Sequence, residues 1–177
     1  MSIDLLGQLD MLKLALEYNI YVLRVFNLKD EYLVKEINKV DNLYAFIPYY
    51  EYYRRDLDLI EQKKMFPGYV FISTTYNQEE FNAALISNEH IYKCYVELRN
   101  EDTSALRKDE QESLKILLND VGVLKMSKAI RVDKKTIVYD GPLSSFNENI
   151  KRVDVHNKLA YLDLHCFDRL IKAGVDI

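Results

Sequence analysis

Chemically reactive side chains are few in this sequence and form no catalytic pattern. The three histidines are His90, His156 and His165, and the last is followed directly by Cys166. Neighbouring side chains in a strand point to opposite faces, so this His-Cys pair is a poor metal site. The sequence has no HExxH, P-loop, GxGxxG or nucleophile-elbow motif, and no carboxylate pair is marked for acid–base work. We therefore expect no enzymatic activity, no cofactor and no metal.

A segment rich in tyrosine and arginine, residues 49–64, is better suited to binding than to catalysis. Aromatic rings can stack on unpaired bases while arginine contacts phosphate. Glu51, Asp56 and Asp58 dilute the positive charge, and a ladder of tyrosines across a hairpin is the alternative that we favour. The weak nucleic-acid candidates of this kind are Arg24, Tyr52, Arg54, Arg55, Lys63 and Lys64.

Charge is unevenly distributed along the chain. The net charge of −4 argues against a protein held to nucleic acid by charge alone. Basic residues nevertheless outnumber acidic ones after residue 120, whereas the preceding part is acidic, which suggests two units with different partners. Lys128, Arg131, Lys151 and Arg152 are the candidates for an RNA contact there, and ordinary surface cations are the equal alternative.

Length and composition restrict the class of protein. The 177 residues, of which 49% are hydrophobic, can bury a core in one sizeable domain or in a domain plus a smaller one. No apolar run approaches a membrane span, and the start of the chain lacks a secretory signal. The two cysteines are far apart with no CxxC pattern, which favours a reduced cytoplasmic protein. Because no apolar run is long enough, we also expect no membrane partner.

Residue periodicity predicts an α/β sandwich over the first two thirds of the chain. Leucines at helical spacing predict a helix over residues 4–17, and Asn27 is expected to cap another that buries Leu33, Ile37 and Val40. Asn77 and Glu80 form a capping pair before a third helix. Further segments follow the same rules: strands at 20–26, 44–48, 69–73 and 91–96, a hairpin arm at 49–64 and a helix at 107–119.

After Asn119 the pattern changes to short strands only. Five such strands in about 50 residues, separated by turns, indicate a small barrel. Predicted structural turn residues are Pro67 and Gly68 in the first part and Gly141 and Pro142 in the second.

Two sequence stretches resemble the NusG family. KKMFPGYVFI at residues 63–72 is similar to the signature of the NusG N-terminal domain, and IVYDGPL at 137–143, followed by IKRVD at 150–154, is similar to the family's C-terminal KOW domain. The resemblance implies an α+β fold, with a NusG-type α/β sandwich (an antiparallel sheet with helices) followed by a small KOW β-barrel. The expected domains are an N-terminal extension at 1–18, the NusG N-terminal domain at 19–120, a linker at 121–128 and the KOW domain at 129–177.

The resemblance also implies a docking site. In the family, aromatic residues of the strand after FPG grip the coiled-coil tip of the RNA polymerase clamp, a role that falls here on Tyr69 and Phe71 with Phe66 nearby. Tyr69 and Phe71 point to one side of the predicted strand and Val70 and Ile72 to the other. The alternative is that both rings are ordinary core residues.

The function implied by the resemblance is a transcription elongation factor that suppresses pausing and termination. The tail resembles specialised LoaP-like paralogs, which act as processive antiterminators in selected operons. Upstream DNA or nascent RNA, and Rho or a ribosomal protein through the KOW domain, are further implied partners. Two alternatives stay open: an RNA-binding KOW module that acts without polymerase, and a paralog that promotes pausing or inhibits a sibling factor.

Overall fold

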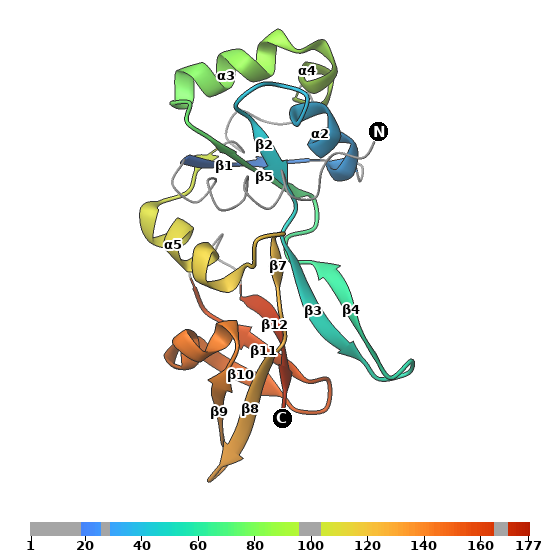
Figure 1. Cartoon of the computed structure of the whole chain (residues 1–177), viewed down its shortest axis with the longest axis vertical. Coiled ribbons are helices and arrows are strands. Elements are labelled where there is room, and N and C mark those ends of the chain that lie inside the picture. The colour runs from blue at the N-terminus through green and yellow to red at the C-terminus, as the bar shows by residue number, and fades with distance from the viewer. Residues whose placement is uncertain (1–18, 26–28, 96–103, 165–169) are drawn as a thin grey trace. The chain divides into compact units, whose positions relative to one another are not determined.

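A computed structural model describes residues 19–25, 29–95, 104–164 and 170–177 (Figure 1). The helix expected at 4–17, the cap at Asn27 and the His165-Cys166 pair lie outside these residues. Chain contacts define two compact units, one made of residues 1–47 and 66–111 and the other of residues 48–65 and 112–177. No helix within the described ranges is long and apolar enough to cross a membrane.

The first unit is built on a four-stranded antiparallel sheet in the order β2-β5-β1-β6. Its strands are β1 (Asn19–Arg24), β2 (Tyr44–Phe46), β5 (Tyr69–Thr74) and β6 (Ser104–Ala105). β1 and β5 pair along their whole length and carry the β-branched and aromatic residues that favour strands. The strands predicted at 20–26, 44–48 and 69–73 are thereby confirmed.

Helices α2 (Asp30–Ile37), α3 (Gln78–Ser87) and α4 (Glu89–Tyr95) lie on one side of this sheet (Figure 1). The predicted capping pair is confirmed, because the Asn77 side chain accepts the backbone N–H groups of Glu79 and Glu80 and the Glu80 carboxylate accepts that of Asn77. Phe81 is fully buried and stacks on Tyr21 with ring centroids 4.1 Å apart.

The strand predicted at residues 91–96 is wrong, since α4 occupies this segment. Asn88 caps the helix, and its Oδ1 accepts the backbone N–H groups of His90 and Ile91 at 3.0 and 3.2 Å. Ile91 and Cys94, one helical turn apart, are both buried. The apolar residues therefore follow a helical period rather than a strand period.

The helix predicted at 107–119 is confirmed as α5 (Lys108–Leu117), which buries Leu114 and Leu117.

The second unit contains the predicted hairpin arm, formed by β3 (Tyr49–Arg54) and β4 (Leu59–Lys64). The two strands pair from Tyr49 opposite Lys64 to Arg54 opposite Leu59. β3 also pairs in parallel with β7 (Val123–Leu124), which is buried and lies inside the segment expected to be a linker. This pairing is why the compact units do not follow the expected domain boundaries, which themselves stay a prediction.

The five short strands expected in the C-terminal part are confirmed as one sheet in the order β10-β11-β12-β8-β9. They are β8 (Ser127–Val132), β9 (Lys135–Asp140), β10 (Ile150–Asp154), β11 (Leu159–Leu162) and β12 (Ile171–Asp176). A 3-10 helix that was not predicted, η2 (Pro142–Asn149), joins the edge strands β9 and β10.

Both predicted glycine turns are confirmed by left-handed backbone. Gly68 has a φ of 81° and Gly141 a φ of 94°. At Gly141 a Cβ atom would lie only 2.8 Å from the Cα of Ser127 in β8, so this turn requires glycine for space as well as for conformation.

Candidate functional site

The aromatic residues expected to dock on a partner are largely buried in the first unit. Phe71 is fully buried and Phe66 is 4% exposed, with their ring centroids 5.4 Å apart, whereas Tyr69 is half-buried. Phe66 and Phe71 therefore lie among core residues, as in the alternative stated from the sequence, because both faces of β5 are buried from Val70 onward. A polymerase contact by these residues stays a prediction.

Arg54 and Lys63 are engaged within the arm itself. Arg54 donates from Nη1 to Glu61 at 2.9 Å and from Nε and Nη2 to Asp56, each at 3.1 Å. The Tyr52 hydroxyl donates to Glu61 at 2.7 Å, and Lys63 lies over the Tyr52 ring at 4.6 Å. Across the hairpin the tyrosines of β3 face Lys64, Lys63, Glu61 and Ile60 rather than other tyrosines. The side chains of Tyr52, Arg54, Glu61 and Lys63 point at one another rather than forming an open cationic face.

Charge-assisted hydrogen bonds perturb the acid–base properties of the arm. The hydrogen bond to Glu61 raises the pKa of Tyr52, and the same bond lowers the pKa of Glu61. The Arg54 guanidinium lowers the pKa of Asp56. These shifts follow from the internal pairing and give no sign of a reactive group.

The arm also rests on the five-stranded sheet, within the second unit. Glu51 accepts a hydrogen bond from Lys125 Nζ at 2.6 Å and from the backbone N–H of Met126 at 3.0 Å. A Cβ atom at Gly174 in β12 would lie 2.4 Å from the carbonyl oxygen of Glu51. Farther along the arm, Arg55 Nη1 lies 2.8 Å from Nε2 of His156, in the turn between β10 and β11.

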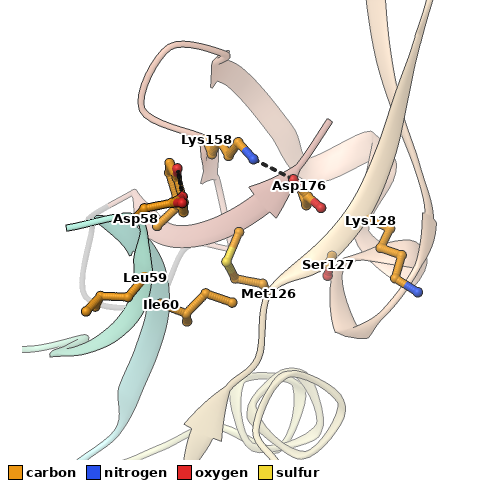
Figure 2. Close-up of a pocket in the computed structure, with 9 residues that line it drawn as sticks. Asp58, Leu59, Ile60, Met126, Ser127, Lys128, Lys158 and Asp176 are labelled. Atoms are coloured by element: carbon orange, nitrogen blue, oxygen red, sulfur yellow. Dashed lines mark hydrogen bonds and ion pairs between the residues drawn. The ribbon is translucent and has the colours of Figure 1, made fainter. Parts of the chain in front are cut away.

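Figure 2 shows a pocket of about 560 Å³ near the tip of the arm. Leu59, Ile60 and Met126 supply apolar surface, while Lys158 donates to Asp176 at 2.7 Å on the opposite side. The same ion pair raises the pKa of Lys158. Lys158 and Asp176 of this pocket are therefore already paired with each other.

A second concavity, of about 390 Å³, differs in being strongly cationic. We call it the basic seam groove and define it by its five cations, Arg131, Lys134, Lys135, Lys151 and Arg152. They come from β8, the β8–β9 turn, β9 and β10, so the groove lies where the two edge strands of the sheet approach each other. No aspartate or glutamate is among the described residues that line it.

Most of the groove's cations are available to a ligand. Within the part of the chain that the structure describes, Arg131, Lys134 and Lys135 make no ion pair, and all three are exposed. Lys151 lies 3.6 Å from Asp163, and the guanidinium of Arg152 lies over the Tyr161 ring at 4.1 Å. The structure thus brings together three predicted residues, Arg131, Lys151 and Arg152.

The remaining nucleic-acid candidates lie elsewhere. Lys128 pairs with Asp140 at 3.2 Å, which raises the pKa of the lysine, and it lines the pocket at the arm tip. Arg24 is exposed at the end of β1 in the first unit, and Lys64 is half-buried in β4. None of these three lines the basic seam groove.

Sequence reasoning missed one residue that shapes the groove. Asn147 of η2 accepts the backbone N–H of Val138 and donates to its carbonyl oxygen, both at 2.8 Å. The side chain therefore satisfies the outer edge of β9 as a neighbouring strand would. An asparagine shortly after a GPL turn gives little sequence signal for this role, because its partner is set only by the fold.

Comparison with known proteins assigns the family. A family model described as transcription termination factor nusG matches residues 19–115, which is more than half of the chain and includes the first sheet and the arm. No curated protein sequence matches the chain significantly. Within the described residues, no group of three or more histidine, cysteine or acidic side chains could hold a metal ion. The chain belongs to the NusG family of transcription elongation and termination factors, whose members generally bind RNA polymerase.

Proposed function

We propose that this protein is a transcription elongation factor that binds RNA polymerase and suppresses pausing and termination in selected operons. The observation that carries the proposal is the family match over residues 19–115, which contains KKMFPGYVFI and the sheet formed around β5. The protein works in the cytoplasm, where bacterial polymerase is found, and performs no chemistry of its own.

The polymerase contact lies at β5 and the turn before it. Tyr69 offers the clamp coiled coil a half-exposed aromatic ring, and Phe66 and Phe71 support the strand from the buried side. Rigid aromatic residues provide a large contact area at low entropic cost. A partner can touch Phe66 or Phe71 directly only after a movement that uncovers them.

The five-stranded sheet is the proposed KOW domain. Its support is the DGPL turn, where Gly141 has no room for a side chain, together with the order of five short strands. The resemblance of the tail to LoaP-like paralogs supports action in selected operons. Rho or a ribosomal protein as a ligand of this domain rests on the same resemblance.

The mechanism needs only selective binding. A ligand shifts an equilibrium by the difference in its affinity for the two states. If the protein binds elongating polymerase about tenfold more tightly than paused polymerase, it favours elongation by about 1.4 kcal/mol. Pausing and termination then become less frequent without any covalent step.

The decisive experiment is reconstituted bacterial transcription through an intrinsic terminator, with and without the protein. We expect increased readthrough that Tyr69→Ala reduces and Tyr32→Ala, an exposed tyrosine of α2, leaves unchanged. Phe71→Ala is unsuitable as the main variant, because emptying a fully buried ring site costs about 3–5 kcal/mol of stability. Absence of polymerase binding, where a family control binds, would overturn the proposal.

The same assay separates the alternatives. A pause-promoting paralog would lower readthrough or lengthen pauses, and an inhibitory one would act only against a sibling factor. The RNA-binding module is favoured by one specific observation, namely that no acidic residue in the described ranges lines the basic seam groove. Such a module would bind RNA in a salt-dependent way while Tyr69→Ala changed nothing.

A further inference from the structure

The geometry points to the basic seam groove as a binding site for the phosphate backbone of single-stranded nucleic acid. All residues of this site belong to the described part of the second unit. Only the origin of the nucleic acid, a transcribing polymerase, rests on the proposed function.

Charge gives the first argument. Five cations line one concavity, and none of its lining residues in the described part of the chain is a carboxylate, although the whole chain is acidic. Three of them, Arg131, Lys134 and Lys135, make no ion pair within the described ranges. Unpaired cations gathered on a small surface repel one another, and a polyanion relieves this repulsion and releases its own counterions.

The distribution of the cations gives the second argument. Arg131, Lys134 and Lys135 belong to β8, β9 and their turn, whereas Lys151 and Arg152 belong to β10 at the other edge of the sheet. A strand lying in the groove would meet cations from both edges. A duplex presents its phosphates on a wide convex surface, so it would reach the rim rather than the interior of a concavity of about 390 Å³.

The apolar lining gives the third argument. Ile150, Val153 and Val155 line the same concavity as the cations. Bases can cover such surface while the phosphates meet lysine and arginine. An acidic peptide would satisfy the charges but would leave this apolar surface without a matching partner.

The fit of the groove to a ligand also depends on its rigidity. Asn147 lines it and fixes the Val138 peptide of β9 through two hydrogen bonds of 2.8 Å. Arg152 is held against the Tyr161 ring. The walls are therefore organised before a ligand arrives, which lowers the entropic cost of binding.

The test uses the full chain and a short fluorescent RNA without secondary structure, with anisotropy measured between about 50 and 200 mM salt. The variant combines Arg131→Gln, Lys134→Gln and Lys135→Gln, which keep the side-chain stems. Its charge-matched control combines Lys35→Gln, Lys108→Gln and Lys172→Gln, all exposed lysines outside the groove. Circular dichroism is the check that both variants are folded.

We expect the groove variant to bind at least tenfold more weakly at low salt. The slope of log K against log salt should fall by about 2, because three phosphate contacts at about 0.7 each are lost. The control should keep the wild-type slope. A variant with Lys134→Arg and Lys135→Arg, which keeps both charges, should bind RNA as the wild type does. Equal binding by the groove variant and the wild type, or competition by polyglutamate as strong as that by RNA, would overturn the inference.

Two strands share this chemistry at a transcribing polymerase, the emerging RNA and the unpaired DNA strand. A photocrosslinker in place of Lys135, in a reconstituted elongation complex, identifies which strand occupies the groove, and either product supports the site. If Arg131→Gln with Lys134→Gln abolishes crosslinking from position 135 but keeps Tyr69-dependent readthrough, the proposed function stands apart from the groove. If the wild type binds RNA alone but never polymerase, the groove stands and the proposed function fails.

Discussion

The arm and the basic seam groove both carry clustered cations, yet they differ in what those cations face. In the arm, Arg54 is held by Asp56 and Glu61, and Lys63 lies on a tyrosine ring. In the groove, no carboxylate of the described residues lines the concavity that five cations share. The tyrosines and adjacent arginines of the arm are the more typical sequence for nucleic-acid binding. The groove, however, has the cations that make no ion pair within the described residues.

The comparison teaches that a cation's partner matters more than its presence. Charge density along a sequence measures how many cations a segment has, whereas binding of a polyanion depends on those left without an internal acid. The contacts of the arm stabilise the hairpin itself and hold it against the C-terminal sheet. Four experiments can break or sharpen this difference, beginning with the largest expected effect.

The first prediction concerns the seat of the arm. Gly174→Ala should destabilise the second unit by about 1–3 kcal/mol, since the new Cβ atom would lie 2.4 Å from the Glu51 carbonyl oxygen and 2.7 Å from Met126 Cγ. Urea unfolding measures this loss, and faster hydrogen exchange at the Val175 amide, bonded to the Lys158 carbonyl oxygen, localises it. Lys172→Ala, on the same strand but exposed, is the matched control. Unchanged stability of Gly174→Ala would show that the arm does not press on β12.

A second prediction concerns the wall of the groove. Asn147→Ala should cost about 1–2 kcal/mol, because the buried Val138 peptide loses its partners for both N–H and carbonyl oxygen. RNA affinity should fall as well if a rigid wall aids binding. Asn147→Asp keeps the acceptor for the N–H and should lie between the wild type and the alanine variant. Unaltered exchange of the Val138 amide in Asn147→Ala would contradict this role.

The third prediction concerns an arm whose arginine has lost its acidic partners, as in the groove. Asp56→Asn with Glu61→Gln should release Arg54 and raise affinity for single-stranded RNA about fivefold at 0.1 M salt, the effect of one added phosphate contact. Asp41→Asn with Glu79→Gln changes the net charge equally in the first unit and should give a smaller gain. If the two double variants bound RNA equally, total charge rather than internal pairing would decide, and the comparison would fail.

Much of the fold could be predicted from the sequence because its signals are local. The Asn77–Glu80 capping box, the arm's paired strands and the Gly68 and Gly141 turns each depend on residues close together in the chain. The failure at residues 91–96 is also local. There Asn88 caps a helix, while the apolar residues after it resemble a short strand.

The site was harder to predict because its features depend on distant contacts. Phe71 alternates correctly along β5, but its burial depends on neighbours from other parts of the fold, among them Phe46 at 5.7 Å. Arg131 and Arg152 are 21 positions apart in the sequence and share a concavity only because the sheet brings its edge strands together. The excess of basic over acidic residues in the C-terminal part was visible in the sequence. Which of these cations make no ion pair with an acidic side chain was not.

The smallest expected effect is a pH response of the arm. The hydrogen bond from Tyr52 to Glu61 raises the pKa of the phenol and lowers that of the carboxyl. The phenol's raised pKa means that this bond helps below the ordinary tyrosine range and is lost as pH rises through the raised value. The carboxyl's lowered pKa means that the bond helps above the ordinary glutamate range and is lost as pH falls through the lowered value.

NMR titration of the Tyr52 ring carbon, assigned with Tyr52→Phe, should therefore show late ionisation of the phenol in the wild type. Glu61→Gln removes the carboxylate that holds the proton, so the Tyr52 pKa should move back toward its usual value, and the response at acid pH should disappear. A Tyr52 titration unaffected by Glu61→Gln would mean that the arm's polar groups are not paired in solution. The contrast with the groove would then lose its basis, because Arg54 depends on the same carboxylate.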